Sequence, residues 1–148
     1  MLNIMKKYIL SLSVIFSSLS LVSQDGDPHK ILGVWKSPSR ELMIKIDQIG
    51  DHFQGRIVWI QSSNSNQPAL DIHNPDERLQ KVPLKGNKVI QELSFNAAKT
   101  VWEGGTFYNY EEGKLYNCLI TLQSDDKIKI TRYLNNQQDG IDETWERQ

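Results

Sequence analysis

Only one cysteine, Cys118, occurs among the 148 residues of the sequence. A single cysteine cannot form a disulfide within the chain, so a fold stapled by disulfides is excluded. Basic residues are not in excess either, because 17 lysines and arginines stand against 18 aspartates and glutamates. Without a basic stripe, neither nucleic acid nor an anionic membrane surface is an expected partner.

Patterns of catalytic and metal-binding residues are also missing. The histidines His29, His52 and His73 are far apart in the sequence, and none has a second histidine or a cysteine at ligand spacing. Asp71, His73 and Asp76 could be imagined as metal ligands, but helix capping is the better explanation of this segment. No nucleophile elbow and no phosphate-binding glycine loop is present. We therefore expect no enzyme activity, no metal and no cofactor.

The apolar run near the N-terminus is too short, and too diluted with serine, to span a membrane. Lys6 and Lys7 precede a mostly apolar segment, residues 8–16, and a serine-rich run follows to Ser23. This order is typical of a secretory signal peptide. We expect removal of residues 1–23 and export of the mature protein to the periplasm or the outside. The mature net charge is then −3, because two lysines and no acidic residue are lost.

After a polar lead-in at residues 24–30, residues 31–148 are expected to form one domain. Short segments of alternating apolar and polar residues are separated by turn-forming residues. They lie at residues 31–35, 41–47, 53–60, 88–95, 127–134 and 141–147, with a hairpin that starts near residue 100. About eight such strands predict an all-β fold, an antiparallel up-and-down β-barrel. The long loop after residue 60 contains Asn74-Pro75, which predicts one short helical turn at residues 74–79.

The hairpin within residues 102–118 is the best-defined element. Its turn chemistry predicts that Phe107 faces Tyr116 and that Gly105 faces Cys118. The apolar face, which includes Phe107, Tyr116 and Cys118, should then point inward. Gly104-Gly105 predicts a bend, as closed barrels need. We interpret Cys118 as a buried thiol and not as a nucleophile.

Six segments taken in order resemble one bacterial exported family, the domain of unknown function 2147. They are residues 31–36 (ILGVWK), 55–59 (GRIVW), 71–76 (DIHNPD), 83–86 (PLKG), 102–118 and 144–147 (TWER). The function of that family is not established, so the resemblance implies no chemistry. This chain departs from the family pattern at Gln80, where a basic residue is usual, and at Thr131-Arg132-Tyr133, where Arg-Gly-Tyr is usual. The turn at residues 135–141 is also more polar than in the family.

The pattern Gly33-x-Trp35 with a late Arg147 is similar to the calycin barrels, such as the lipocalins. In calycins a tryptophan from the first strand packs under an arginine and closes the floor of the barrel. Alternation places Trp145 and Arg147 on one face of the last strand, which permits this contact. An arginine above an indole ring is physically favourable.

Two hypotheses about function remain open. The first is binding of a small apolar or amphiphilic molecule, with an anionic group that would meet Arg132, inside a hollow barrel. Arg132 falls on the apolar face, where an inward charge requires a partner, water or a ligand, unless it reaches the rim. The second is an envelope protein-interaction module with a solidly packed barrel, whose surface would contact the partner. Tyr108 and Tyr110 are the candidate aromatic residues on that surface. We expect a monomer in either case. The proposed ligand-binding face comprises Phe53, Ile57, Trp59, Phe107, Tyr116, Ile130 and Arg132.

Overall fold

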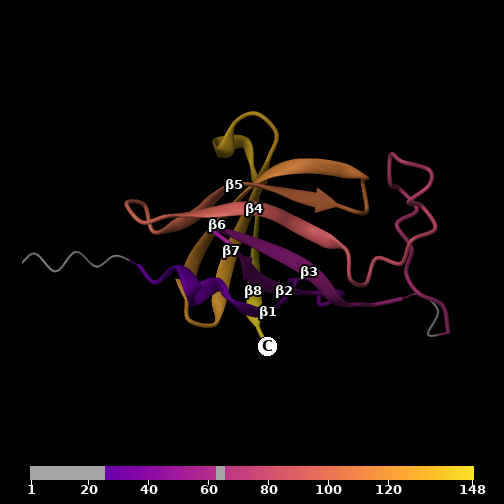
Figure 1. Ribbon diagram of the computed structural model, residues 1–148, viewed down its shortest axis with the longest axis horizontal. Coiled ribbons are helices and arrows are strands. Elements are labelled where there is room, and N and C mark those ends of the chain that lie inside the picture. The colour runs from indigo at the N-terminus through magenta and orange to yellow at the C-terminus, as the bar shows by residue number, and fades with distance from the viewer. Residues whose placement is uncertain (1–25, 63–65) are drawn as a thin grey trace, which may run out of the picture.

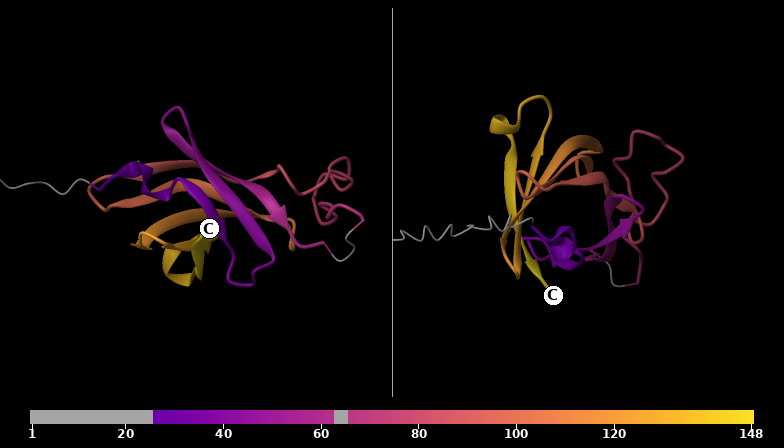
Figure 2. Two further views of the ribbon diagram at one scale, coloured as in Figure 1. Left: turned by 90° about the horizontal axis from the view of Figure 1, so that it is seen from below. Right: turned by 60° about the vertical axis from the view of Figure 1, so that its left-hand side comes forward.

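The computed structural model describes residues 26–62 and 66–148 and shows eight antiparallel strands that close into one barrel (Figures 1 and 2). Each strand pairs with the next along the chain, and the last pairs with the first. The predicted antiparallel up-and-down barrel is confirmed. The strands are β1 (Gly33–Lys36), β2 (Leu42–Ile49), β3 (His52–Ile60), β4 (Lys88–Asn96), β5 (Val101–Asn109), β6 (Lys114–Ser124), β7 (Lys127–Tyr133) and β8 (Ile141–Arg147).

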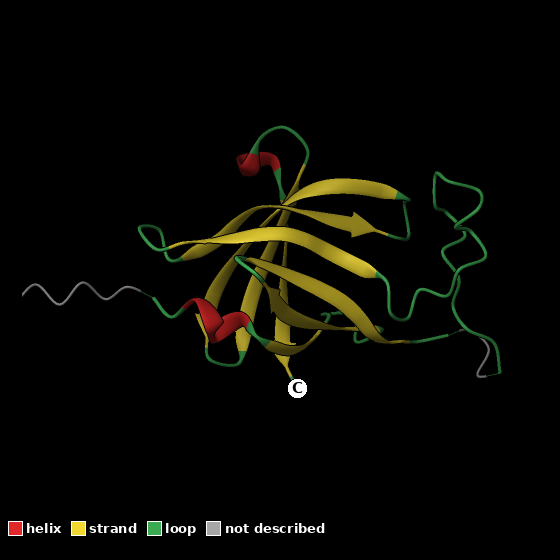
Figure 3. Cartoon of the chain, in the orientation of Figure 1, coloured by secondary structure: helices red, strands yellow, loops and turns green. Residues whose placement is uncertain are grey.

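Helical structure is limited to two 3-10 turns in the described part of the chain, η1 (Pro28–Ile31) and η2 (Gln137–Asp139) (Figure 3). No helix of the described residues is long and apolar enough to cross a membrane. Residues 74–79, where a short helical turn was expected, contain hydrogen-bonded turns, in which the amides of Leu79 and Gln80 donate to the carbonyls of Asp76 and Glu77, and no regular helix. Asn74 accepts a bond from the amide of Asp76, and Asp76 accepts one from the amide of Arg78. These side chains hold separate turns and so compete with a helix.

The β5–β6 hairpin has the predicted register, with Phe107 opposite Tyr116 and Gly105 opposite Cys118. Gly104 has a φ of +79° and lies at a register shift in the ladder. A Cβ atom on Gly105 would collide with the main chain of β4. The two glycines therefore form the predicted bend, Gly104 through its conformation and Gly105 through close approach of another strand.

Side chains fill the interior of the barrel. Cys118 is fully buried there, as expected, beside the large apolar residues. Burial of this many apolar groups is the main source of stability for such a fold. The largest fully buried side chains are Trp35, Trp102, Trp145, Phe53, Ile31, Ile44, Ile46, Ile57, Ile90, Leu93, Ile120 and Ile128.

One end of the barrel is closed by η1, which lies at the left in Figure 1. The indole N–H of Trp35 donates to the carbonyl of Ile31 at 2.8 Å, and that of Trp102 donates to the carbonyl of Pro28 at 3.0 Å. Both tryptophans thus place their polar atom on the main chain of η1 while their rings fill the core. Residues 26–30, expected as a lead-in outside the barrel, are part of its floor. Residues 24 and 25, like the predicted signal peptide at 1–23, lie outside the described residues.

Arg147 completes this closed end. Its guanidinium lies 4.2 Å from the Trp35 ring centroid, the contact that the likeness to calycins implies. The guanidinium also donates to the carbonyl oxygens of Lys30, Leu32 and Asp125 at 2.6–2.7 Å. Gly33 is required beside it, because a Cβ at φ +133° would lie 2.7 Å from the Arg147 Nη1 atom. Gly33, Trp35 and Arg147 therefore form one closed unit.

The other end of the barrel is bordered by longer connections. The described residues of the β3–β4 connection, 61–62 and 66–87, extend beyond the strands at the right of Figure 1. The β5–β6 turn and the β1–β2 connection reach the same end, since they join strands that run toward it. Any site in this barrel that opens to solvent is therefore expected at this end.

Candidate functional site

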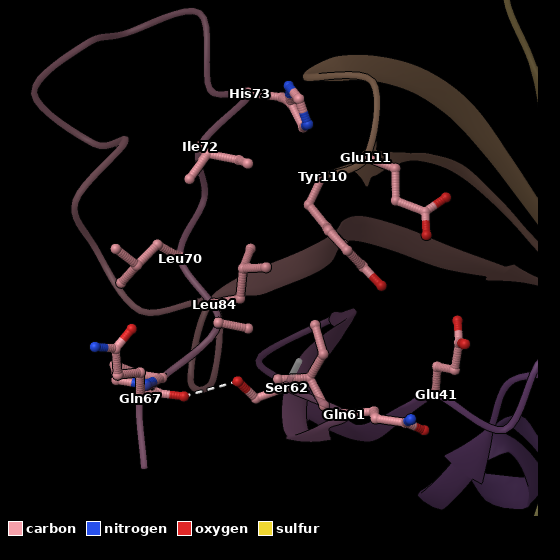
Figure 4. A pocket seen from close by; sticks show the side chains of 13 residues that line it. Glu41, Gln61, Ser62, Gln67, Leu70, Ile72, His73, Leu84, Tyr110 and Glu111 are labelled. Carbon is pink, nitrogen blue, oxygen red and sulfur yellow. Dashed lines mark hydrogen bonds between the residues drawn. The ribbon is translucent and has the colours of Figure 1, made fainter. Parts of the chain in front are cut away.

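A pocket of about 580 Å³ lies at the open end, between the β3–β4 connection and the mouth of the barrel (Figure 4). Its volume falls within the range of small-molecule sites, about 300–1,000 Å³. The β1–β2 connection through Glu41, the end of β3, the β3–β4 connection and the β5–β6 turn all contribute to it. The lining residues are Glu41, Ile60, Gln61, Ser62, Gln67, Pro68, Ala69, Leu70, Ile72, His73, Leu84, Tyr110 and Glu111.

The β3–β4 connection forms one wall of this pocket and is fastened to the barrel. Asp71 is buried and accepts hydrogen bonds from the Tyr108 hydroxyl at 2.8 Å and from Asn74 Nδ2 at 2.7 Å. Loss of hydration and the neighbouring Asp71 raise the pKa of Tyr108 to about 12. Farther along, the carbonyl of His73 lies so close to Gly113, φ +64°, that a Cβ there would collide with it. The segment at residues 71–76 therefore packs against the β5–β6 hairpin and holds the β3–β4 connection in place.

A second, smaller pocket of about 160 Å³ adjoins the first and shares Glu41, Tyr110 and Glu111 with it. Arg132 and Glu143 line this smaller pocket, together with Phe107 and Trp145 among others. It lies over the packed interior, because Phe107 and Trp145 are both core residues. The two pockets together form the open end of the barrel, here called the mouth, and the interior beneath them is filled by side chains.

The Arg132 side chain points inward and forms an ion pair with Glu143. Its Nη2 lies 2.5 Å from a Glu143 oxygen, and the other Glu143 oxygen accepts the Trp145 indole N–H at 3.1 Å. The guanidinium also lies over the rings of Phe107 and Tyr116, at 5.1 and 5.9 Å from their centroids. The Arg132 side chain is 11% exposed, so this pair is held in a poorly hydrated environment.

Negative charge gathers around Tyr110, one of the three residues that line both pockets. Loss of hydration raises the pKa of Tyr110 to about 12, and the charges of Glu111, Glu41 and Glu143 raise it in the same direction. Three carboxylates and one arginine thus line the smaller pocket. Among the described residues, no group of three histidine, cysteine or acidic side chains is arranged to hold a metal ion.

The family model of an uncharacterized protein conserved in bacteria, DUF2147, matches residues 33–147. The chain belongs to this family. A solved structure, protein HP1028 from the human pathogen Helicobacter pylori, is described as belonging to the lipocalin family. The two structures superpose with a TM-score of 0.69 over 80% of this DUF2147 protein and 82% of the Helicobacter protein. Their sequences are 20% identical, so the likeness is one of fold. No curated protein matches the sequence.

The structure separates the residues that we expected on one ligand-binding face of this DUF2147 protein. Phe53, Ile57 and Ile130 are buried in the packed interior and line neither mouth pocket. Phe107 and Arg132 line the smaller pocket. Tyr116 is partly buried beside Arg132, with its hydroxyl bonded to Glu112. The seven residues therefore do not form one binding surface.

Trp59 was placed wrongly on the inner face. The β2–β3 ladder pairs Ile44 with Ile57 and Met43 with Trp59, which leaves Val58 as an extra residue. A bulge of this kind reverses the alternation of side chains that follow it. Trp59 is therefore 39% exposed on the outside of the barrel.

Sequence reasoning missed the residues that shape the larger pocket. Tyr110, expected only as a surface feature of an interaction module, lines the mouth together with Glu111 of the β5–β6 turn. Leu84 belongs to the segment at residues 83–86 and is buried against the core. The available signal was that residues 71–76 of the long loop and the hairpin at residues 102–118 are both among the segments that resemble the family. Nothing in the local sequence shows that the loop folds back over that tip.

Proposed function

We propose that this DUF2147 protein binds a small amphiphilic molecule at the open end of its barrel. The observation that carries the proposal is the pocket of about 580 Å³, whose lining combines apolar side chains with polar and charged ones. Binding sites for small molecules are typically concave and apolar with a few placed polar groups. The tail of a ligand would lie against Ile60, Leu70 and Leu84, and its polar group would reach Tyr110.

The ligand is placed at the mouth and not deep within the barrel. Small barrels can be filled by their own side chains or can hold one ligand, and here the central positions are occupied by tryptophan, phenylalanine and isoleucine. The Arg132–Glu143 pair lies between the mouth and this filled interior. An acid group at Arg132 would lie beside the carboxylate of Glu143, which repels it. The Arg132 Nε, which has no partner among the described residues, is buried, so the case for an anionic ligand is weak.

Binding rather than catalysis is the role that we infer. The one thiol, Cys118, is buried, and burial raises its pKa to about 12, which opposes formation of a reactive thiolate. The proposal also includes export, which rests on the signal-peptide pattern of residues 1–23. N-terminal sequencing of protein recovered from the cell envelope or medium tests export, with a start near Gln24 expected and a start at Met1 contradicting it.

A second candidate is an envelope protein-interaction module, and the packed interior favours it. Exposed apolar side chains on the barrel and its loops, such as Trp59 and Leu115, would then contact a partner. Single exposed apolar side chains are common on protein surfaces, so we rank this function second.

Thermal unfolding in the presence of nonionic alkyl amphiphiles separates the two functions. A ligand at about a hundredfold excess over its Kd should stabilise the protein by about 2.7 kcal/mol. Ala69→Trp fills the larger pocket and should abolish the effect. Ile49→Trp changes an exposed residue at the β2–β3 turn and should retain it. If no amphiphile raises the melting temperature, the interaction module becomes the better function.

A further inference from the structure

The lining of the larger pocket carries an excess of negative charge. Its described lining includes the carboxylates of Glu41 and Glu111 and no lysine or arginine. Neither of these carboxylates forms an ion pair within the described part of the chain, unlike Glu143 below them, which neutralises Arg132. Glutamate side chains are anionic at neutral pH. The pocket therefore presents two uncompensated negative charges to whatever enters it.

These charges lie at one side of the pocket. In Figure 4 the carboxylates of Glu41 and Glu111 and the hydroxyl of Tyr110 are on the same side, whereas Leu70 and Ile72 are on the opposite side. Burial and, in smaller part, the charges of Glu111 and Glu41 raise the pKa of Tyr110 to about 12, which agrees with the position of both carboxylates near this ring. The pocket thus has an acidic side that includes an aromatic ring, and Leu70 and Ile72 lie opposite it, together with the polar Gln67.

We propose that the pocket selects amphiphiles whose polar group is a cation, with an alkyl or aryl tail on the apolar side and an ammonium group among Glu41, Glu111 and Tyr110. An ammonium group gains from two carboxylates without ion partners, and the face of an aromatic ring also attracts cations. A carboxylate at the same place is repelled by both. This inference rests on the proposed function and specifies its ligand class.

Arg132 does not reverse this preference. Its charge is balanced by Glu143, and it lines only the smaller pocket, which contains Glu41 and Glu111 as well. An anionic ligand would therefore meet more carboxylates than guanidinium groups on its way to Arg132. The anionic group that the sequence alone suggested is thus replaced by a cationic one.

The test compares octylamine, 1-octanol and octanoate, which share a tail and differ in charge. Isothermal titration calorimetry of the mature protein at neutral pH should show octylamine binding about tenfold or more tightly than octanoate, with 1-octanol between them. The preference should shrink when the salt concentration is raised from about 0.02 M to about 0.5 M, because the interacting charges are partly exposed.

Variants locate the charge effect in the pocket. The double change Glu41→Gln and Glu111→Gln should remove most of the preference for octylamine over octanoate. Glu77→Gln removes an exposed carboxylate that does not line the pocket, and it should keep the preference. This control also separates site binding from general attraction of amines to an acidic protein.

The outcomes test the preference for a cationic ligand separately from ligand binding at the mouth. Equal binding of the three compounds, or tightest binding of octanoate, would overturn the cationic preference and leave amphiphile binding at the mouth intact. Retention of the preference in the double variant would also overturn it. Binding of none of the three to the wild-type protein would overturn the proposed function and the inference together.

Discussion

The hydroxyl of Tyr108 lies 2.8 Å from a carboxylate oxygen of Asp71, and this hydrogen bond ties the β3–β4 connection to strand β5. Asp71 is only 2% exposed, and its other oxygen accepts a bond from Asn74. A buried carboxylate requires such partners because it has lost its water. The bond therefore fixes a wall of the mouth pocket as well as a loop.

Tyr108→Phe should lower the free energy of unfolding by about 1–3 kcal/mol, because it leaves a buried carboxylate with one donor fewer. Urea denaturation measures the loss. Amide hydrogen exchange should accelerate in residues 70–84 more than in β8, since the loop is released while the barrel remains closed. Tyr133→Phe is the matched control, because no hydrogen bond is made by the Tyr133 hydroxyl within the described residues. Equal losses in both variants would contradict this role of Tyr108.

A second prediction isolates the contact of the loop with the hairpin turn. Gly113 and Gly50 have nearly the same φ, +64° and +60°, so alanine imposes similar backbone strain at both, about 1 kcal/mol. A Cβ on Gly113 would also collide with the carbonyl of His73, whereas one on Gly50 would meet no atom within 4 Å. Gly113→Ala should therefore cost about 1–3 kcal/mol more than Gly50→Ala in chemical denaturation. Equal costs would show that the loop yields without loss.

Local patterns were sufficient to predict most of the barrel. Alternation and turn residues determine which side of each strand is apolar, so the β5–β6 register and the inward position of Cys118 followed from the sequence. The same rule failed at Trp59, because the bulge at Val58 depends on how β3 pairs with β2. A register shift between strands is a property of the pair, and one strand read alone does not show it.

The site was harder to predict than the fold. Its lining comes from segments far apart in the sequence, such as Glu41, Leu84 and Tyr110. Their proximity depends on the long loop that folds back over the hairpin, and contacts such as Tyr108 with Asp71 leave no local periodicity. The sequence left open whether Arg132 points inward or reaches the rim, because its partner Glu143 belongs to the neighbouring strand and was not identified.

The two tryptophans Trp35 and Trp59 provide a matched pair for the floor of the barrel. Trp35→Ala should destabilise the protein by about 3–5 kcal/mol, because it removes a fully buried ring and the support for Arg147. Trp59→Ala should cost about 1 kcal/mol or less, since its ring is on the outside. Urea denaturation of both variants measures the difference. A loss below about 1 kcal/mol for Trp35→Ala would contradict the closing role of this residue.

Cys118 should make the stability of the protein depend on alkaline pH. Burial raises its pKa from 9.0 to about 12 in the folded state. Because the folded pKa is the higher one, the stabilisation is complete below about pH 9 and is lost as the pH rises toward about 12, by up to about 1.4 kcal/mol per pH unit. Cys118→Ala should be less stable by about 1–2 kcal/mol at neutral pH because of the cavity. The free energy of unfolding of this variant should nevertheless fall less steeply above pH 9, as measured by urea denaturation with a reducing agent present. Some dependence on pH should remain, because the pKa values of Tyr108 and Tyr110 are also raised. Parallel curves for the two proteins would show that the thiol ionises without opposing the fold.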